Sequence, residues 1–485
     1  MTERTSVVIV GAGTCGLAAA CELRRAGVDV RLLERDDAPG TGSRATLLWP
    51  LGLAVLRGLD VIHEARRRGL PLDALHYHLA DGRTLRTTVG AENEALVLAQ
   101  HATNAILEEA LTAAGGRVER SSHVSGITPG ADGVTVKVDR PGGTELIEAD
   151  WLIAADGVGS TVRRLLGIDF PGTSLPTRYL AVEGAIDGDL PAGAVHYFLR
   201  PAGPMVVAPL RGGTVRMGAP VPDGTELTEA TVQRVLTERG GDGLVLRRLD
   251  DITTFASQER VAAALRQGRC FLVGDAAHTH SPIGGQGLNL GLQDVHNLTW
   301  KLAGVIRGAF AETLLDSYEP ERRQAARQTV QNTHRFARMF TLGPRRARVR
   351  NAAWRGLDAA GVLRRHFVPL LAGRRVTYPD VLPGAPARPV RGLPAPGERL
   401  PGNPPPGARR DVLRLLTLGD PGLERAGAAL AARHPGRLAH EHRPGGRGFV
   451  LVRPDGFVAR SGRTVQDLDL TATLPAGLAP APEGD

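Results

Sequence analysis

Three glycines near the N-terminus, Gly11, Gly13 and Gly16, have a spacing that suits phosphate binding, and Glu34 follows them. Glycines so placed permit a tight turn, let the backbone approach a pyrophosphate and let a helix pack closely on a sheet. The start of that helix offers free N–H groups and partial positive charge to the phosphates. A carboxylate about 20 residues further on can accept hydrogen bonds from an adenosine ribose. The pattern predicts an adenine dinucleotide site without separating FAD from NAD, and a glycine-rich turn without a ligand is the alternative.

A second candidate site lies in GRCFLVGDAAHTHSPIGGQGLNLGLQ, where Asp275 follows a buried strand and a glycine-rich loop leads into a helix. A carboxylate at a strand end is well placed to bind the ribitol hydroxyls of a flavin. The second helix start would favour negative charge on the pyrimidine end of a reduced flavin. Because a plain dehydrogenase does not need this second site, the pair of motifs favours FAD over NAD.

The cysteines and the nearby histidines do not point to a metal or redox centre. Cys15, Cys21 and Cys270 lie in apolar surroundings without metal-ligand spacing, so we expect buried, unreactive thiols. His278 and His280 lack further ligands in the surrounding sequence, and we expect a structural or loop role for them. We therefore expect no metal site and find no Ser-His-Asp set.

Arginine dominates the charge of the chain. The 59 basic and 51 acidic residues give a net charge of +8, and Lys137 and Lys301 are the two lysines, which is typical of codon bias in a GC-rich genome. The arginines are spread along the chain without interleaved aromatic residues, so we expect no nucleic-acid partner. Their charge could still draw in an anionic pyridine nucleotide. No apolar run is long enough to span a bilayer and no signal peptide is evident, so we expect a cytoplasmic protein without a membrane partner.

The elements that must position the two glycine turns have an α/β pattern. SVVIVG is a continuous apolar run, typical of a parallel strand covered on both faces, and VDVRLLER is the next strand. Between them we predict a helix over 13–26, with Gly27 as its stop signal. A helix over 102–114, a β-meander over 118–139, the strands ADWLIAAD and CFLVGDAA, and a long helical region over 288–340 follow.

The remaining segments predict two further units. LHYHLADGRTL resembles two short strands around an Asp-Gly turn, and residues 171–264 are strand-rich and loop-rich. There, Tyr197, Phe198, Met205 and Met217 could line a substrate site, although at strand spacing plain core is more common. Residues 341–375 are Arg-rich with helical spacing, 378–410 form a Pro-rich linker, and 411–470 hold a helix and a hairpin before a disordered tail.

A third motif, AADGVGSTVR with Asp156, Gly157, Ser160 and Arg163, completes a resemblance. The chain resembles the single-component aromatic hydroxylases, FAD-dependent monooxygenases related to para-hydroxybenzoate hydroxylase, and within them the phenol-hydroxylase branch that tailors bacterial aromatic polyketides. The resemblance covers residues 1 to about 345 well and the C-terminal unit weakly. That unit is similar to the thioredoxin-like appendage of the branch, but without CxxC we expect no redox activity there.

The resemblance implies an α/β fold with a Rossmann-type FAD-binding domain, a β-rich substrate domain and a small C-terminal thioredoxin-like α/β domain. The implied boundaries are 1–72, 97–170 and 265–345 for the FAD-binding domain, 73–96 and 171–264 for the substrate domain, 346–410 for a helical segment and linker, and 411–485 for the C-terminal domain.

The resemblance also implies cofactor contacts, residue by residue, and leaves the catalytic residues unknown. In chain order they are Gly11, Gly13, Thr14 and Gly16 at the pyrophosphate, Glu34 at the ribose, Arg35 at the adenosine edge, Arg44 at the flavin-side phosphate or ribitol, Gln100 at the ribitol and phosphate, Val124 at the adenine, Asp156 at FAD and the pyridine nucleotide, Asp275 at the ribitol, and Pro282, Gly285, Gly287, Leu288 and Asn289 along the isoalloxazine ring. The chain departs from the family at Asn104, which replaces the usual acid, and at His101 and His296.

The implied reaction is reduction of FAD by NADPH or NADH, formation of a C4a-hydroperoxyflavin with O2, and oxygen transfer to a small aromatic substrate of the polyketide type by a monomer or homodimer. Three alternatives stay open. The same flavin could perform Baeyer–Villiger insertion or epoxidation, the enzyme could inactivate an antibiotic as rifampicin monooxygenases do, or the chain could be a catalytically idle FAD-binding protein. A flavin halogenase is disfavoured because the tryptophan-rich signature of that group is missing.

Overall fold

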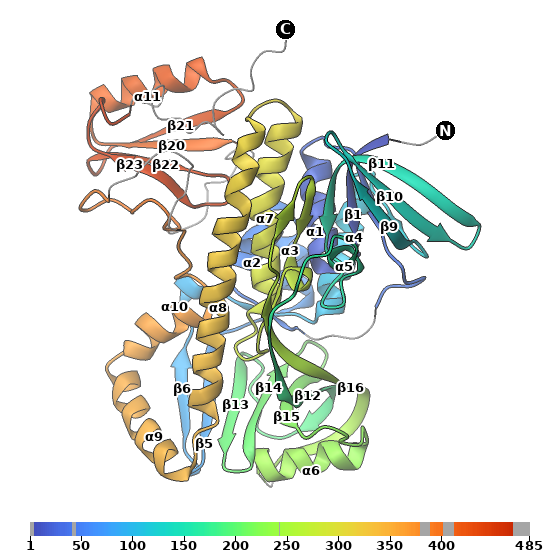
Figure 1. Ribbon diagram of the computed structural model, residues 1–485. Helices are drawn as coiled ribbons and strands as arrows, with labels where there is room; N and C mark the ends of the chain where they lie inside the picture. The colour runs from blue at the N-terminus through green and yellow to red at the C-terminus, as the bar shows by residue number, and fades with distance from the viewer. Residues whose placement is uncertain (1–3, 41–44, 242, 379–388, 401–411, 469–485) are drawn as a thin grey trace.

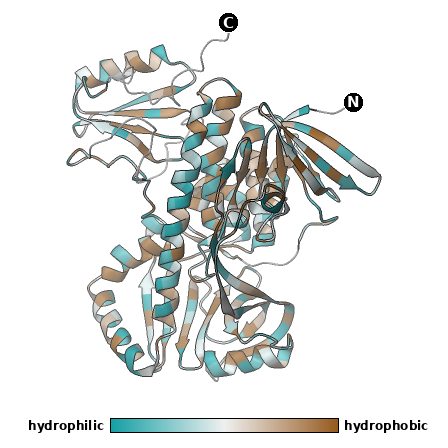
Figure 2. Cartoon of the chain, viewed as in Figure 1, coloured by the Kyte–Doolittle hydropathy of each residue, from teal (hydrophilic) through white to brown (hydrophobic). Residues whose placement is uncertain are grey.

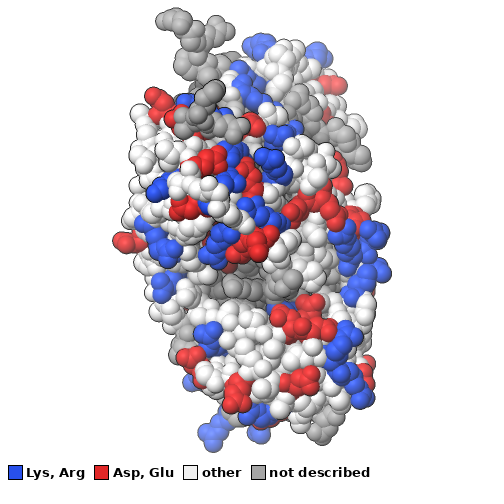
Figure 3. All heavy atoms as spheres, turned by 90° about the vertical axis from the view of Figure 1, so that its right-hand side faces the viewer, with Lys and Arg blue, Asp and Glu red and all other residues white. Residues whose placement is uncertain are grey.

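The computed structural model describes residues 4–40, 45–241, 243–378, 389–400 and 412–468 (Figure 1). Three layered units are stacked along the long helices α7 and α8. No helix among the described residues combines the length and the apolar character needed to cross a bilayer. On the face seen in Figure 3, basic and acidic side chains are interspersed.

The first unit is built on a twisted sheet whose central strands are parallel. β1 pairs in parallel with β2 on one side and with β11 on the other. Val7, Val8 and Ile9 of β1 are fully buried, as expected for a strand covered on both faces. The strands are β1 (Arg4–Val10), β2 (Val30–Leu33), β8 (Val118–Glu119), β9 (His123–Pro129), β10 (Val134–Arg140), β11 (Gly143–Ala154), β17 (Arg266–Gln267) and β18 (Cys270–Leu272).

Helices cover this sheet and carry the glycine turns at their starts. α1 packs between α4 and α7, and Gly27 ends the α1 segment in the left-handed conformation, with a φ of 76°. The predicted helix boundaries are correct to within two residues at α1 and α4. The helices here are α1 (Thr14–Arg25), α2 (Pro50–Gly58), α3 (Ile62–Arg68), α4 (Gln100–Ala113), α5 (Thr161–Leu165), α7 (Gly287–Ile306) and α8 (Tyr318–Phe340), with short turns η2 (Gly274–Ala276) and η3 (Glu312–Ser317). A small sheet of β3 (Leu47–Leu48), β7 (Leu96–Val97) and β4 (Leu70–Pro71) borders them.

The second unit is an eight-stranded sheet in the order β19-β16-β12-β15-β14-β13-β5-β6. It joins two distant chain segments, because β13 pairs in parallel with β5 while the other pairings are antiparallel. The strands are β5 (Ala74–Leu79), β6 (Thr84–Thr88), β12 (Gly172–Asp187), β13 (Ala194–Arg200), β14 (Gly203–Pro209), β15 (Val215–Val221), β16 (Val245–Val261) and β19 (His278–Thr279), and the turn η1 (Ala91–Asn93) follows β6.

Residues 171–264 are strand-rich, as predicted, but one helix of this unit, α6 (Glu229–Gly240), is absent from the prediction. The Thr228 side chain caps the helix by accepting from the Thr231 N–H at 3.2 Å. Val232, Val235 and Leu236 recur at helical spacing and are buried against the sheet. The cap and the spacing are both visible in the sequence, so this helix was predictable.

Long helices connect the units. α8 has 23 residues, hence a length of about 35 Å, and extends from the first unit along the edge of the second (Figure 1). Figure 2 shows teal and brown alternating along α8, as expected for a helix with one packed and one solvated face. The Arg-rich helix α9 (Pro344–Ala359), the turn η4 (Leu363–Phe367) and α10 (Val368–Leu371) follow it.

The C-terminal unit is a four-stranded sheet in the order β21-β20-β22-β23 with one helix. β20 and β21 are parallel and β22 is antiparallel to β20, which is the thioredoxin-like arrangement that was predicted. The elements are β20 (Leu413–Leu418), α11 (Pro421–Arg433), β21 (Leu438–Arg443), β22 (Gly448–Val452) and β23 (Val458–Gly462). Residues 379–388 and 401–411 of the predicted linker, and the predicted disordered tail, lie outside the described residues.

A buried charge network joins this unit to α7 and α8. Arg453 donates to Glu321 at 2.5 and 2.8 Å and to Asp455 at 2.5 Å. Lys301 of α7 donates to the same Glu321 at 2.9 Å. All four charged groups are buried and have lost their contact with water. Ion pairs and hydrogen bonds within the network must therefore replace their hydration.

Candidate functional site

The first glycine turn packs against the chain so closely that side chains are excluded at two of its three glycines. A Cβ on Gly11 would lie 2.6 Å from the Ala155 carbonyl oxygen, and one on Gly16 would lie 1.8 Å from the Gly11 oxygen. Gly11 also has a φ of 98°. A Cβ on Gly13, in contrast, would meet no described atom within 4 Å. Gly13 therefore borders open space beside the start of α1.

The start of α1 is not capped by a side chain. Gly13 is the N-cap, and the first intrahelical bond runs from the Leu17 N–H to the Gly13 oxygen at 2.9 Å. The N–H groups of the preceding residues point out of the helix end, where an anion binds most readily. The Thr14 hydroxyl donates to Asn104 of α4 at 2.6 Å, so the residue that departs from the family contacts this turn directly.

Glu34 lies at the end of β2, next to the same turn. Its carboxylate accepts from the Ala12 N–H at 2.7 Å and from the Asp36 N–H at 3.1 Å. Its backbone oxygen accepts from the Ser122 N–H at 2.8 Å, which brings the segment leading into β9 and buried Val124 alongside. Arg35 is exposed, 3.6 Å from Asp36. The strand ends thus gather Glu34, Arg35 and Val124 on one side of the turn.

The Asp-Gly motif lies against the first glycine turn, because the Gly11 Cβ position is 2.9 Å from the Asp156 Cα. One Asp156 oxygen caps α5 by accepting from the Val162 N–H at 3.0 Å. The other oxygen is buried and has no partner among the described residues. A buried acceptor without a donor is costly, so it marks a position where a ligand or water belongs.

Arg163 links this motif to the second candidate site. Its guanidinium is buried and donates to the carbonyl oxygens of Val158 at 2.9 Å and Ala276 at 2.8 Å, and it covers the ring of Phe170 at 3.9 Å. Burial lowers its pKa from the usual value. Because Ala276 directly follows Asp275, Arg163 fixes the strand end that carries the predicted ribitol ligand.

Cys15 packs the start of α1 against η2 and α7. A Cβ on Gly274 or on Gly291 would lie 2.7 or 2.6 Å from the Cys15 sulfur, so α1 can pack against α7 only because both positions are glycine. Burial raises the pKa of Cys15 well above its usual value and that of Cys270 to about 12, as expected for unreactive thiols. Asp275 itself is exposed, so its carboxylate is accessible at this junction.

Asp294 of α7 holds the segments of this junction together by hydrogen bonds. It was not among the residues predicted from the sequence. It is fully buried and accepts from the Gly274 N–H at 2.9 Å, His278 Nε2 at 2.6 Å and Arg322 Nε at 2.6 Å. Burial opposes its ionisation, but His278 and Arg322 outweigh burial and hold its pKa below the usual value. An aspartate inside an otherwise apolar helix was the available signal. His278 has the structural role that was predicted.

The second glycine turn leads into α7. The Gly285 N–H donates to the Pro282 oxygen at 3.2 Å, and α7 starts at Gly287 after Gln286, whose side chain does not cap it. The Asn289 side chain instead accepts from the Trp49 N–H at 2.7 Å and donates to the Leu47 oxygen at 2.8 Å. Asn289 can therefore offer a ligand only its backbone, as can Leu288 beside it.

His280 is a further residue at this turn that the sequence assigned only to the loop. Its Nδ1 lies 2.8 Å from the Ser281 oxygen, and its Nε2 is buried without a partner among the described residues. A Cβ on Gly287 would lie 3.4 Å from that Nε2. Burial lowers the pKa of His280 to about 4, so a neutral imidazole faces the start of α7.

Two residues, Gln100 and Arg44, are predicted to contact the flavin-side phosphate. Gln100 at the start of α4 accepts from the Ala45 N–H at 3.3 Å, while Arg44 lies outside the described residues. Among the residues that depart from the family, His101 is exposed, whereas His296 contacts Glu22 at 2.9 Å and so ties α7 to α1.

An aromatic cluster lies between the second sheet and α8 and α9. Tyr77 stacks on Tyr197 with ring centroids 5.3 Å apart, and both pack against Phe340 of α8. Trp49 of the same cluster donates from its indole to the Gly284 oxygen at 3.0 Å, which connects the cluster to the second glycine turn. The Tyr77 hydroxyl is buried without a described partner. The other predicted lining residues, Phe198, Met205 and Met217, belong to the separate core under α6.

Comparisons with known proteins identify the family. A model described as FAD binding domain matches residues 4–333. The chain belongs to this family. The match includes both glycine turns and the Asp-Gly motif, so the predicted resemblance to FAD-dependent aromatic hydroxylases is confirmed, as are the fold class and the preference for FAD over NAD.

Three full-length relatives show the range of the family. The chain is 30% identical over 97% of its length to 6-methylpretetramide 4-monooxygenase of Streptomyces rimosus, covering 93% of that protein. It is 32% identical over 98% of its length to dialkyldecalin synthase of Streptomyces rugosporus, covering 99% of that protein. Among solved structures, the OxyS anhydrotetracycline hydroxylase of Streptomyces rimosus has a TM-score of 0.80 at 30% identity, over 99% of this chain and 100% of that chain. The expectation of an FAD-dependent monooxygenase is thus confirmed at the level of the family.

Proposed function

We propose that this protein is an FAD- and NAD(P)H-dependent monooxygenase that hydroxylates a small aromatic compound of the polyketide type. The observation that carries the proposal is the pair of helix starts without side-chain caps, at α1 and at α7, in two helices that pack together through Cys15 and Gly291. One helix start suits the pyrophosphate of a dinucleotide and the other suits the pyrimidine edge of a flavin ring. The described residues fit FAD, because buried acceptors at Asp156 and His280 lack partners beside both turns.

In this proposal, each element holds one part of FAD. Gly13, Thr14 and the rest of the first turn bind the pyrophosphate, Glu34 binds the ribose, and Asp275 binds the ribitol hydroxyls. Arg35 and Val124 border the adenosine, while Arg44, Gln100 and Asp156 serve the flavin-side phosphate and the transient pyridine nucleotide. Pro282 and the backbone from 285 to 289 border the ring. FAD, when bound and reduced by NAD(P)H, supplies the activation of O2, which no side chain of the chain provides.

The protein's own contribution is position, exclusion of water and electrostatics. The His280 imidazole beside the start of α7 is neutral. The positive end of the helix dipole is therefore the feature that can stabilise negative charge at the edge of the flavin ring. The aromatic cluster around Tyr77 and Tyr197 provides an apolar wall for a flat substrate, and the Tyr77 hydroxyl can orient a polar group on it. We propose the domain division at 73–96 and 171–264 on the same basis, because the strands of these segments share one sheet.

A second candidate function is FAD-assisted catalysis without oxygen transfer. The relative named dialkyldecalin synthase favours it, because that protein covers the whole chain and its name describes no oxygenation. FAD would then be a structural part of the pocket, and a polyene would replace the aromatic ring as substrate.

One experiment separates the two functions. The yellow holoprotein is incubated with NADPH or NADH and a panel of aromatic polyketides under 18O2, and cofactor oxidation and product mass are followed. The monooxygenase predicts faster NAD(P)H consumption with substrate and one 18O atom in the product. Unlabelled, isomerised product without NAD(P)H consumption would instead establish the second function. A label in a ring-expanded lactone or an epoxide would identify the same oxygen transfer with a different outcome.

A further inference from the structure

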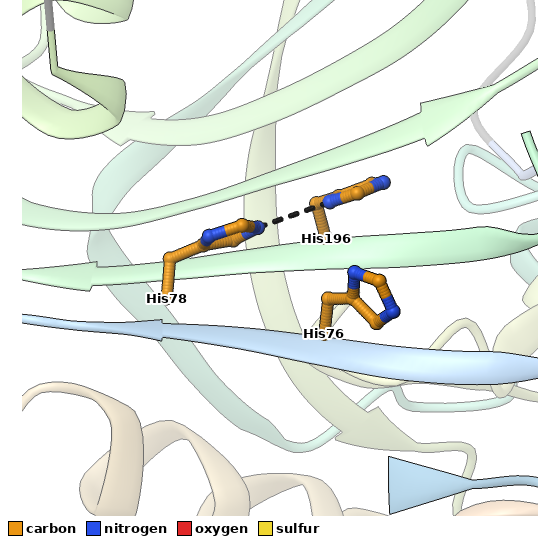
Figure 4. Close-up of side chains that lie close together, drawn as sticks. All are labelled: His76, His78 and His196. Carbon is orange, nitrogen blue, oxygen red and sulfur yellow. Dashed lines mark hydrogen bonds between the residues drawn. The ribbon is translucent and has the colours of Figure 1, made fainter. Parts of the chain in front are cut away.

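Three histidines from distant parts of the chain meet on one face of the second sheet (Figure 4). His76 and His78 lie two residues apart on β5, and His196 on β13 is the parallel partner of His76. Because side chains alternate along a strand, all three imidazoles project from the same face. Tyr77 and Tyr197 project from the other face, toward the aromatic cluster. The histidine cluster and the proposed substrate wall therefore occupy opposite sides of the same strands.

The ring nitrogens already have nearly the spacing of metal ligands. His78 Nε2 lies 3.0 Å from His196 Nδ1. One nitrogen from each of the three rings lies within 4.8 Å of the others. Nitrogens bound at 2.0–2.1 Å to a tetrahedral zinc ion are about 3.3 Å apart, so His76 would have to approach by about 1.5 Å or less. A change of side-chain torsion achieves that without moving the strands.

The outer hydrogen bonds suit metal ligation. His196 Nε2 lies 3.4 Å from the Pro191 carbonyl, so this nitrogen carries the proton and leaves the Nδ1 lone pair to the cluster. Thr84 Oγ1 lies 3.0 Å from His78 Nδ1 and can accept its proton once Nε2 is a ligand. Such partners fix the tautomer and ring orientation of metal-bound imidazoles.

Burial and nearby charged side chains act on the pKa values of the three imidazoles. Burial lowers the pKa of both His78 and His196 to about 4. Arg86 lowers the pKa of His76 and Arg200 lowers that of His78, while the exposed Asp189 acts in the opposite direction on all three rings. A water molecule would complete a tetrahedral site as the fourth ligand.

We propose that His76, His78 and His196 form a binding site for a divalent transition-metal ion of the zinc type. Three imidazole donors select zinc, cobalt, nickel or copper over calcium and magnesium, which prefer oxygen. The bound ion would clamp the β5–β6 hairpin to β13, the parallel pair that joins the two segments of this sheet. The role is structural and independent of the flavin. It departs from the expectation of no metal, because 118 residues separate His78 from His196 and no local spacing reveals the site.

The test uses full-length holoprotein without a histidine tag, stripped with a chelator and dialysed. Titration with Co2+ should give one saturable equivalent and the visible bands of tetrahedral nitrogen-coordinated cobalt in the difference spectrum. Added Zn2+ should displace Co2+ and raise the apparent melting temperature, since a ligand that binds only the folded state stabilises it. Absence of saturable Co2+ binding would show that His78 and His196 form only a hydrogen-bonded pair, and would overturn the proposal.

Single substitutions test which side chains bind the ion. His76→Gln, at a half-buried position whose side chain makes no hydrogen bond to the other described residues, should weaken Co2+ binding at least tenfold and abolish the tetrahedral bands. Thr84→Val should weaken binding by roughly 10-fold to 100-fold, because it removes an outer hydrogen bond only. The matched control is His63→Gln, at an exposed histidine of α3, which should bind as the wild type does. Equal binding by His76→Gln and wild type would refute the site even if His196→Gln fails to fold.

Discussion

Replacing Gly291 by alanine tests whether α1 must pack closely against α7. The added methyl would lie 2.6 Å from the Cys15 sulfur and 3.2 Å from the Gly274 Cα, whereas ordinary contacts are about 3.5–4.0 Å. Cys15 is enclosed between α1 and α7 and cannot swing away, so the helices must separate. Overpacking of this kind costs about 1–3 kcal/mol.

The matched control is Gly356→Ala in α9, where the new methyl meets no described atom within 4 Å. Both substitutions gain the same helix propensity of about 1 kcal/mol, so their difference isolates the overlap. We expect the free energy of unfolding of Gly291→Ala to be about 1–3 kcal/mol lower than that of the control. Adding Cys15→Ala should recover part of this loss, because it removes the sulfur that clashes.

The assay is urea unfolding of both variants with and without FAD, together with FAD affinity measured by flavin fluorescence. Gly291→Ala should also bind FAD less tightly, because Cys15 adjoins Thr14 at the first turn and Gly274 adjoins Asp275 at the second. Equal stability and equal FAD affinity in the two glycine variants would refute the argument. So would a double variant in which Cys15→Ala gives no recovery.

Three further predictions concern charged groups at the site. Asp275→Ala should lower the flavin content of purified protein, because ribitol hydroxyls lose a charged partner worth about 1.5–3 kcal/mol, and normal content would contradict the assignment. Glu34→Ala should lower the affinity for FAD by a smaller amount than Asp275→Ala, since the Glu34 carboxylate also accepts from the Ala12 N–H. An unchanged affinity would argue against the ribose role. Asp294→Asn should flatten the acid limb of the pH–stability curve. The lowered pKa of Asp294 means that its contribution is present above the unfolded-state pKa of about 3.9 and is lost as pH falls below it, so an unchanged acid limb in the variant would exclude that role.

The sequence was sufficient for the parts of the fold that are encoded locally. The apolar run of β1, the glycines of the first turn and the stop at Gly27 all act within a few residues of one another, and each is found where it was predicted. The same holds for the hairpin of β5 and β6 around Asp81 and Gly82. The helix α6 was missed although its cap and spacing were equally local.

Contacts across the chain could not be predicted in this way. Asp294, Cys15 and Arg163 act by meeting groups that are distant in sequence, so no spacing identifies their partners. Tyr197 and Phe198 are neighbours in sequence, yet the pleat sends them to different cores, and only the former reaches the cluster beside the second turn. The alternation of side chains along a strand predicts that the two residues lie on opposite faces of the sheet. It does not predict which face lies toward the second glycine turn.

The charge network under the C-terminal unit has a consequence for truncation. A chain shortened before Arg453 would remove the guanidinium from Glu321 and leave it with Lys301 and Asn297, in a place where burial already lowers the pKa of that lysine to about 8. Since the cut would also uncover Trp300, Phe310 and Leu314, which share an apolar core with this unit, the long helices that carry the second glycine turn would lose stability with it. The thioredoxin-like unit therefore stabilises the FAD-binding part of the chain, and the whole chain should unfold in a single cooperative step.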